Sequence, residues 1–482
     1  MNECIVPAVC GLSTILVENV PLHSKHNPAA EALRYVDNLH YTNEPQYFIL
    51  VECGLCYIIA PLKKKFPKSK IISVHLSDFI AGNVQYKADF SWQPSQTMCL
   101  NDFLQTVIQD IEAEKVKIIE WRPSLQVYAE KYLNTLSVIV RFIKQSDANK
   151  RTLNGFGKKW FMNVIRNCLL ITNVINIKPV TRNCIVAAAG VSLEKNIEKV
   201  REAKQSGCAF VIAVSSAAPF LFHAGVKPDI IITTDGGSWA LCHLDDVQRC
   251  LTQTNPVPLA FSLNAALPSF VSTLPLIPIS DGSLWQNIVL SALGIRFLSF
   301  PQRGTVSAAA LDLAFILTRG NIFLTGIDFS NDDIKTHCGC YSFDTIFRNS
   351  SCRLNPYYDK KFKRCKVTGN SLQYSIYRNW FNDNIYTKKN VYSIDDLVIN
   401  NMNTGNINYT TTKINGHKNT SIITNVTKSL LEALSLPETK EQINKELSAL
   451  SFNTILDDER RAIKNEILKL TEKYLGMETM YG

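Results

Sequence analysis

The 482-residue sequence has no uninterrupted apolar run as long as the ~18 residues that a membrane-spanning helix requires, so no transmembrane segment is expected. Its first residues, Met1-Asn-Glu-Cys-Ile-Val6, lack the basic stretch and the apolar stretch of a secretory signal. Charged residues are few, at 19%, against 46% hydrophobic residues, which leaves ample material for buried cores. We therefore predict a cytoplasmic protein of two or three folded domains.

Two C-x₂₋₄-C pairs, as in structural zinc sites, are also absent, although the chain has 14 cysteines. They are scattered through strand-like and helix-like segments, which favours reduced, buried thiols over disulfides. Cys53-Gly-Leu-Cys56 is a lone C-x-x-C, for which ordinary burial is a simpler interpretation than redox chemistry. A polar loop region holds His337, Cys338, Cys340, Cys352 and Cys365. Their gaps do not match the paired spacing of structural zinc sites, so no metal site is expected there.

The net charge of +9 is spread along the chain and forms no basic arm. This distribution gives mild support for an anionic ligand and weak support for nucleic acid. The basic-aromatic stretch Lys158-Lys-Trp160 is better explained as part of an amphipathic helix whose lysines are solvated. We therefore expect no nucleic-acid partner.

Apolar strands alternate with amphipathic helices from residue 183 to about 330, which predicts a doubly wound α/β sheet. A smaller α/β domain is predicted in residues 1–150. From 331 to about 425 the pattern gives way to polar loops rich in Asn, Thr and Tyr, and residues 426–482 are predicted to be helical. The expected organisation is therefore an amino-terminal α/β domain, a central domain at 151–425 and a helical tail.

Polar residues follow three neighbouring strands of this predicted sheet. Gly190 and Ser192 lie in the turn after the first strand, Ser215 and Ser216 end the second, and Asp235 ends the third. The first turn lacks the Walker lysine and is not a G-x-G-x-x-G fingerprint, so alone it is equally explained by steric needs. Because ligands lie at the carboxyl ends of parallel strands, the convergence of the three strand ends predicts a nucleotide site.

Asp328 and His337 form a second candidate group. Asp328 follows a predicted strand, and His337 lies nine residues further on in a polar loop. A histidine is a natural general base for drawing a proton from an acceptor hydroxyl near neutral pH. The alternative is a solvated loop histidine without a role.

Short motifs in a fixed order resemble those of a known family. The central motifs are Ala189-Gly-Val-Ser-Leu-Glu-Lys-Asn196, Ala224-Gly-Val-Lys-Pro-Asp229, Thr234-Asp235, Arg303-Gly-Thr-Val306, Leu324-Thr-Gly-Ile-Asp-Phe-Ser330 and Thr336-His337. Upstream lie His23-Ser24, Pro28, Glu31-Ala32, Arg122-Pro-Ser124 and Phe156-Gly-x-x-Trp160. Together they resemble the Maf (motility-associated factor) glycosyltransferases, whose central domain is shared with archaeal 6-hydroxymethylpterin diphosphokinases of the MptE type. The resemblance covers most of residues 20–410.

This resemblance implies a central Rossmann-like sheet similar to that of sialyltransferases, flanked by an amino-terminal α/β domain and a carboxyl-terminal helical region. It also implies transfer of a nonulosonic (sialic-acid-like) sugar from a CMP-activated donor to Ser/Thr of flagellin or another protein acceptor, without a required cofactor. Gly190 and Ser192 would then face the nucleotide phosphate, beside Asp235. Arg303 and Thr305 would lie on the acceptor side. Asp328 and His337 would be the catalytic residues, with His337 as the base.

Two positions depart from the family pattern. Val191 replaces the proline of the usual Gly-Pro-Ser-Leu turn, which leaves a backbone N–H available for phosphate. In the first domain, Glu52-Cys-Gly-Leu-Cys56 stands where a Gly-x-Gly-x-Gly-like turn is expected. Because Glu52 would repel phosphate, the first domain is not expected to bind a nucleotide.

Two other functions remain open at this point. One is a 6-hydroxymethylpterin diphosphokinase, in which ATP and Mg²⁺ use the same turn and Asp235 holds the metal. The other is a non-catalytic flagellin-binding protein whose site has decayed.

Overall fold

The computed structural model describes residues 2–108, 115–251, 256–301, 303–330, 334–369, 374, 377–378, 380–382, 385, 390–399, 409–413, 425–426, 428–430, 432–433 and 435–450. The chain divides into two compact units, Met1–Gly155 and Phe156–Gly482. Helix α5 (Arg122–Leu170) contributes residues to both. None of the described helices is both long and apolar enough to cross a membrane. The three-part division drawn from the sequence stays a prediction.

The first unit contains a parallel sheet with the strand order β6-β5-β4-β7. Its strands are β4 (Tyr47–Val51), β5 (Lys70–Val74), β6 (Phe90–Trp92) and β7 (Val116–Glu120). β4 is apolar and buried at every position, as expected for a parallel strand covered on both faces. The unit also has an antiparallel sheet of β1 (Glu3–Pro7), β2 (Ser13–Val17) and β3 (Val20–Pro21). Its further helices are α1 (Pro28–Asp37), α2 (Ile59–Lys65), α3 (Asp78–Gly82) and α4 (Leu100–Val107).

A carboxylate of the chain itself fills the carboxyl edge of this first sheet. Glu52 follows β4 with a φ of 42°, and its side chain is fully buried. It accepts hydrogen bonds from the backbone N–H groups of Leu76 (2.6 Å) and Ser77 (3.2 Å), and it lies 3.5 Å from Nδ1 of His75. Backbone donors that a phosphate would need at this edge are therefore already taken.

The second unit is built on a larger sheet with the order β16-β15-β9-β10-β11-β12-β13-β8-β17, and β14 also pairs with β13. All of these pairs are parallel except β17 with β8. The strands are β8 (Asn173–Ile177), β9 (Asn183–Ala187), β10 (Ala209–Val214), β11 (Ile230–Thr233), β12 (Leu259–Ser262), β13 (Leu276–Ser280), β14 (Leu298–Ser299), β15 (Ile322–Thr325), β16 (Val391–Ser393) and β17 (Tyr409–Lys413). The predicted doubly wound, mostly parallel sheet is thereby confirmed.

The strand order of this sheet reverses between β9 and β15. From β9 the chain passes through α6 (Ser192–Lys195) and α7 (Ile197–Gln205) to β10, whereas α11 (Val306–Leu317) leads back to β15 on the other side of β9. Because parallel crossovers are right-handed, α7 and α11 cover opposite faces of the sheet. The crevice at such a switch point is where open α/β sheets bind ligands.

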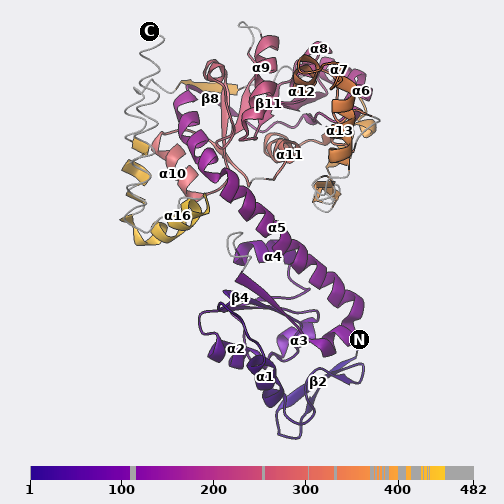
Figure 1. Cartoon of the computed structure of the whole chain (residues 1–482), viewed down its shortest axis with the longest axis vertical. Coiled ribbons are helices and arrows are strands. Elements are labelled where there is room, and N and C mark those ends of the chain that lie inside the picture. The colour runs from indigo at the N-terminus through magenta and orange to yellow at the C-terminus, as the bar shows by residue number, and fades with distance from the viewer. Residues whose placement is uncertain are drawn as a thin grey trace. The chain divides into compact units, whose positions relative to one another are not determined.

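The remaining described helices of the second unit lie around this sheet (Figure 1). They are α8 (Ala218–His223), α9 (Leu241–Cys250), α10 (Leu284–Ala292), α12 (Ser342–Asn349), α13 (Tyr357–Gly369) and α16 (Pro437–Ala449). In α16, the Glu446 carboxylate accepts the N–H groups of Leu284 (3.0 Å) and Trp285 (3.1 Å) at the start of α10. This contact caps α10 from a distant part of the chain and fixes α16 against the sheet domain.

The described parts of the polar region from 331 to about 425 contain regular elements that its sequence does not suggest. It contributes α12 and α13, and two of its segments join the sheet as β16 and β17. β17 reads Tyr-Thr-Thr-Thr-Lys, and threonine is β-branched although it is polar, so it suits an edge strand. The expected helix beyond residue 450 lies outside the described residues.

Candidate functional site

Two glycine turns meet at the switch point of the sheet. The N–H of Gly190, after β9, donates a hydrogen bond of 2.7 Å to the carbonyl of Gly326, after β15. Gly326 has a φ of 71°, and a Cβ there would lie 1.9 Å from the Ala188 carbonyl oxygen. A Cβ on Gly190 would lie 2.5 Å from the Gly326 carbonyl oxygen. Glycine is therefore required on both sides of this contact.

Asp328 binds directly to Ser192, across 136 residues of sequence. Asp328 Oδ2 accepts the Ser192 backbone N–H at 2.8 Å, and Oδ1 accepts the Ser192 hydroxyl. The same hydroxyl accepts the N–H of Gly326 at 2.9 Å. The carboxylate thus takes the N–H and the hydroxyl of Ser192, one of the residues expected to face a phosphate. Ser192 and Asp328 form one hydrogen-bonded unit that joins the β9 and β15 turns.

The next two strand ends differ in how open they are. Ser215 is buried, with its Oγ 3.4 Å from Thr233 Oγ1, whereas Ser216 is partly exposed. Asp235, after β11, is exposed, and its Oδ1 accepts the N–H of Gly237 at 2.7 Å. Of the five predicted nucleotide-binding residues, Ser216 and Asp235 therefore offer side chains to solvent beyond β10 and β11.

Two asparagines of α5 hold the loops beyond β11 and β12, and sequence reasoning missed them. The Asn163 amide donates to the carbonyls of Gly236 (3.2 Å) and Asn264 (2.9 Å). The Asn167 amide donates to those of Leu263 and Ala265, both at 2.8 Å. The sequence does contain a signal for them: Asn163 and Asn167 are four positions apart, and so they lie on the same, otherwise apolar, face of the helix.

The segment 334–341 carries His337 past the β9 turn. The N–H of Cys338 donates to the Ala189 carbonyl at 2.8 Å, and Glu194 of α6 accepts the N–H of Gly339 at 2.6 Å. Glu194 also forms an ion pair with Lys335 at 3.0 Å. These contacts place His337 at the same edge of the sheet as Gly190 and Ser192. Among the described residues, however, Asp328 bonds to Ser192 and makes no hydrogen bond to His337.

His337 lies within a cluster of rings and one guanidinium. Its imidazole stacks on Tyr341 with ring centres 4.0 Å apart and planes at 9°, and its Nδ1 lies 2.9 Å from the Thr336 hydroxyl. The ring of His243, from α9, also contacts Tyr341, and the two ring centres are 5.2 Å apart. Arg364 of α13 donates to the Tyr341 hydroxyl at 2.9 Å. His243, Tyr341 and Arg364 come from separate segments, and no local sequence pattern connects them.

Burial and positive charge keep both histidines of this cluster neutral. Desolvation, and then Arg364 and His243, lower the pKa of His337 from 6.5 to about 3. Desolvation is also the main cause that lowers the pKa of His243 to about 4. Nδ1 of His243 is buried and has no hydrogen-bond partner among the described residues. At neutral pH, His337 is therefore an unprotonated imidazole that can accept a proton.

These two histidines should make the stability of the second unit depend on pH. The folded pKa values lie below the unfolded value of about 6.5, so the unfolded chain binds more protons as the pH falls. The stability that comes from burying the two neutral histidines is fully present above pH 6.5. It should be lost towards pH 4, at up to ~1.4 kcal/mol per pH unit for each histidine. In urea unfolding at pH 7, 6 and 5, His243→Phe should remove about half of this combined dependence.

His223→Gln is the matched control for that experiment, because it removes a histidine from the adjacent helix α8. Its unfolding free energy should keep the pH dependence of the original chain. Equal slopes for His243→Phe and the original chain would show that His243 is not held neutral by its surroundings.

A cavity of about 630 Å³ lies beside His337. Its lining is polar, with charges of both signs that are largely paired within the wall, as in Lys361–Asp344 (3.3 Å) and Arg249–Asp246 (3.1 Å). His337 and Tyr341 form the side nearest the sheet edge. This arrangement can receive a polar chain and present its hydroxyl to a neutral imidazole.

The two predicted acceptor-side residues are engaged in local contacts. Arg303 pairs with Asp312 at 2.8 Å and lies over the Trp380 ring. The Thr305 hydroxyl accepts the Ala308 N–H at 3.2 Å and so caps α11. Their role towards an acceptor stays a prediction.

The cysteines of the predicted polar loops do not gather around a common point. Within the described part of the chain, no three His, Cys, Asp or Glu side chains are placed to hold a metal ion. Cys338 is buried, whereas Cys340 and Cys352 are exposed. At the sheet edge itself, Asp235 and Asp328 are the carboxylates nearest the predicted nucleotide site, and Asp328 is bound to Ser192.

Comparison with known proteins gives a family match for the central part of the chain. The family described as 6-hydroxymethylpterin diphosphokinase MptE-like matches residues 158–333. A protein of Treponema pallidum (strain Nichols), named only as uncharacterized, is 26% identical over 285 residues, which are 58% of this chain and 60% of that protein. This chain thus spans less than two thirds of that relative. The solved structure of a MAf glycosyltransferase from Magnetospirillum magneticum AMB-1 is 11% identical, with a TM-score of 0.49 over 98% of this chain and 90% of that one.

Proposed function

Residues 158–333 of this chain match the MptE-like family, and from this premise we propose that the protein is a glycosyltransferase. The proposed reaction moves a nonulosonic, sialic-acid-like sugar from a CMP-activated donor to a serine or threonine of flagellin, in the cytoplasm. The ordered motifs shared with Maf proteins support the sugar-transfer chemistry. The switch point between β9 and β15 supports a nucleotide at this edge of the sheet.

The contact between Asp328 and Ser192 is the observation that carries the choice of donor. It takes the first donors of the α6 turn and leaves a second carboxylate, Asp235, exposed at the neighbouring strand end. Such an edge is poor in free phosphate donors and rich in negative charge. A CMP-linked nonulosonic sugar carries about two negative charges, one on the phosphodiester and one on the sugar carboxylate, against about four on a nucleoside triphosphate, so it is repelled less.

The acceptor side of the proposed reaction uses His337. The acceptor oxygen would attack the anomeric carbon of the sugar, the bond to phosphate would break, and CMP would leave with the electron pair. The proton of the hydroxyl would pass to the ring nitrogen of His337 that is not bonded to Thr336. Because the pKa of His337 is depressed to about 3, the imidazolium would then lose this proton readily to solvent.

A second candidate function has support from the matched family itself, whose description is that of a pterin diphosphokinase. In that case the substrate would be ATP with Mg²⁺, and Asp235 would be the metal ligand. A third candidate is a non-catalytic flagellin-binding protein that keeps the fold and has lost the chemistry.

Thermal unfolding with nucleotides separates these three functions. We expect CMP without magnesium to raise the unfolding temperature, because a ligand at ~100 times its Kd adds about 2.7 kcal/mol of stability. Asp235→Asn removes the exposed carboxylate that repels the phosphodiester and should increase this protection, whereas Glu202→Gln on the exposed side of α7 should leave it unchanged. Protection by ATP only with magnesium would favour the diphosphokinase. Binding to flagellin without protection by either nucleotide would favour the third function.

A further inference from the structure

A hollow in the first unit lies on the edge of its sheet opposite to Glu52. It has a volume of about 880 Å³ and is lined by residues 40–46 before β4, by Lys68 before β5, and by Lys115 and Lys117 at the start of β7. All of these positions are at the amino ends of the strands. Since Glu52 fills the carboxyl edge, the open binding surface of this small sheet is at its amino edge.

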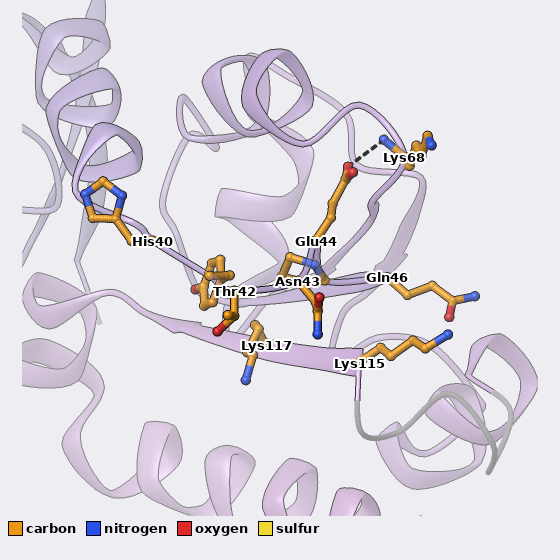
Figure 2. A pocket seen from close by; sticks show the side chains of 10 residues that line it. His40, Thr42, Asn43, Glu44, Gln46, Lys68, Lys115 and Lys117 are labelled. Carbon is orange, nitrogen blue, oxygen red and sulfur yellow. Dashed lines mark hydrogen bonds between the residues drawn. The ribbon is translucent and has the colours of Figure 1, made fainter.

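The charge of this hollow is strongly one-sided. Its basic lining residues are His40, Lys68, Lys115 and Lys117, against the single carboxylate of Glu44. The Glu44 carboxylate accepts the backbone N–H of Lys68 at 3.0 Å, so it is held by a hydrogen bond to the main chain (Figure 2). Among the described residues, none of the three lysine ammonium groups forms an ion pair. Among the described residues that line the hollow, three ammonium groups thus face one carboxylate.

Neutral donors stand among these cations. Figure 2 shows the side chains of Thr42, Asn43 and Lys117 pointing to the same side of the sheet edge. The ammonium group of Lys117 also lies over the Tyr41 ring, 5.7 Å from its centre, in a cation–π contact. The Thr42 hydroxyl, the Asn43 amide and the Lys117 ammonium, which lie on one side of the edge, can donate hydrogen bonds to several oxygens of one anionic group.

The backbone beneath the hollow is firmly held. The N–H of Gln46 donates to the Lys115 carbonyl at 2.9 Å, and the Gln46 carbonyl accepts the N–H of Lys70 at 2.8 Å. The Ser69 hydroxyl donates to the Pro45 carbonyl at 2.5 Å. The loop that carries Thr42 and Asn43 is thereby tied to both neighbouring strands before β4 begins.

The geometry points to a binding site in the first unit for a small phosphorylated molecule that carries at least two negative charges. Its volume lies within the ~300–1,000 Å³ of small-molecule sites, and its lysines supply donors without acceptors, as phosphate oxygens require. This site is separate from the nucleotide edge of the second unit and does not depend on the proposed transferase activity.

Calorimetric titration of the full chain with sodium pyrophosphate, at constant ionic strength set by sodium chloride, tests this site. We expect saturable binding that weakens at least tenfold in the double variant Lys115→Gln/Lys117→Gln. The double variant Lys64→Gln/Lys87→Gln removes the same charge from exposed positions outside the hollow, and should bind within twofold of the original chain. Glu44→Gln removes the one carboxylate and should tighten binding at least threefold.

Three results would overturn the proposal: no pyrophosphate binding, equal weakening by both double variants, or binding of polyglutamate without binding of pyrophosphate. Failure of CMP to protect the chain, by contrast, would contradict the proposed transferase and leave this site unaffected.

Discussion

Gly326→Ala is expected to lower the free energy of unfolding of the second unit by about 4 kcal/mol or more. The new Cβ would lie 1.9 Å from the Ala188 carbonyl oxygen, at a backbone φ of 71° that alanine tolerates poorly. Relief of this overlap requires the β15 turn to move away from β9. That movement breaks the hydrogen bonds that join Gly190, Ser192 and Asp328. Urea unfolding followed at constant m-value measures the loss.

Gly294→Ala provides the matched control for this strain. Gly294 also has a positive φ, of 62°, but a Cβ there would meet no atom within 4 Å. Its substitution should therefore lower the free energy of unfolding by roughly 1 kcal/mol, the strain of holding alanine at a positive φ. Equal losses in the two variants would contradict the close approach of the β9 and β15 turns.

His337→Ala should reduce sugar transfer by about 10²-fold, the lower end of a general base's contribution, because a pKa of about 3 makes the imidazole a weak base. Nucleotide protection against thermal unfolding should stay within twofold of the original chain, because His337 lines the cavity proposed for the acceptor. His26→Gln alters an exposed histidine of the first unit and should keep nearly full transfer. Transfer at the original rate in His337→Ala would remove His337 from the mechanism.

A general base with a depressed pKa also has a signature in the pH profile. Since the pKa of His337 is about 3, kcat/KM should show no loss of activity from its protonation between pH 5 and 8. Arg364→Gln removes a positive charge that contributes to this depression, so it should raise the pKa of His337 and move the acid limb towards neutrality. An unchanged profile in Arg364→Gln would contradict this electrostatic link.

Local sequence was sufficient for the core strands of the second unit. β9, β10 and β11 are short, almost wholly apolar runs that end in polar residues, and this pattern predicts buried parallel strands. β17 was missed because its pairing with β8 is a long-range antiparallel contact between polar edges. α12 was missed because it is short and lies in a segment whose composition resembles a loop.

The candidate site also has parts that local sequence predicts and parts that it does not. The turn with Gly190 and the strand end with Asp235 could be placed from sequence, because strand ends of a parallel sheet meet at one edge. The bond between Ser192 and Asp328 could not, since it depends on β15 lying next to β9. The depressed pKa of His337 requires Arg364 and His243, which the fold brings in from α13 and α9. Such effects depend on tertiary contacts and leave no local pattern.

Asp328 acts at the β9 turn as a tethered anion. The chain holds its carboxylate against Ser192 at an effective concentration that a free ion in solution does not reach. We therefore expect inorganic phosphate to compete poorly for this turn. In the proposed function, discrimination among ligands would fall to the neighbouring strand ends, where Asp235 is exposed to solvent.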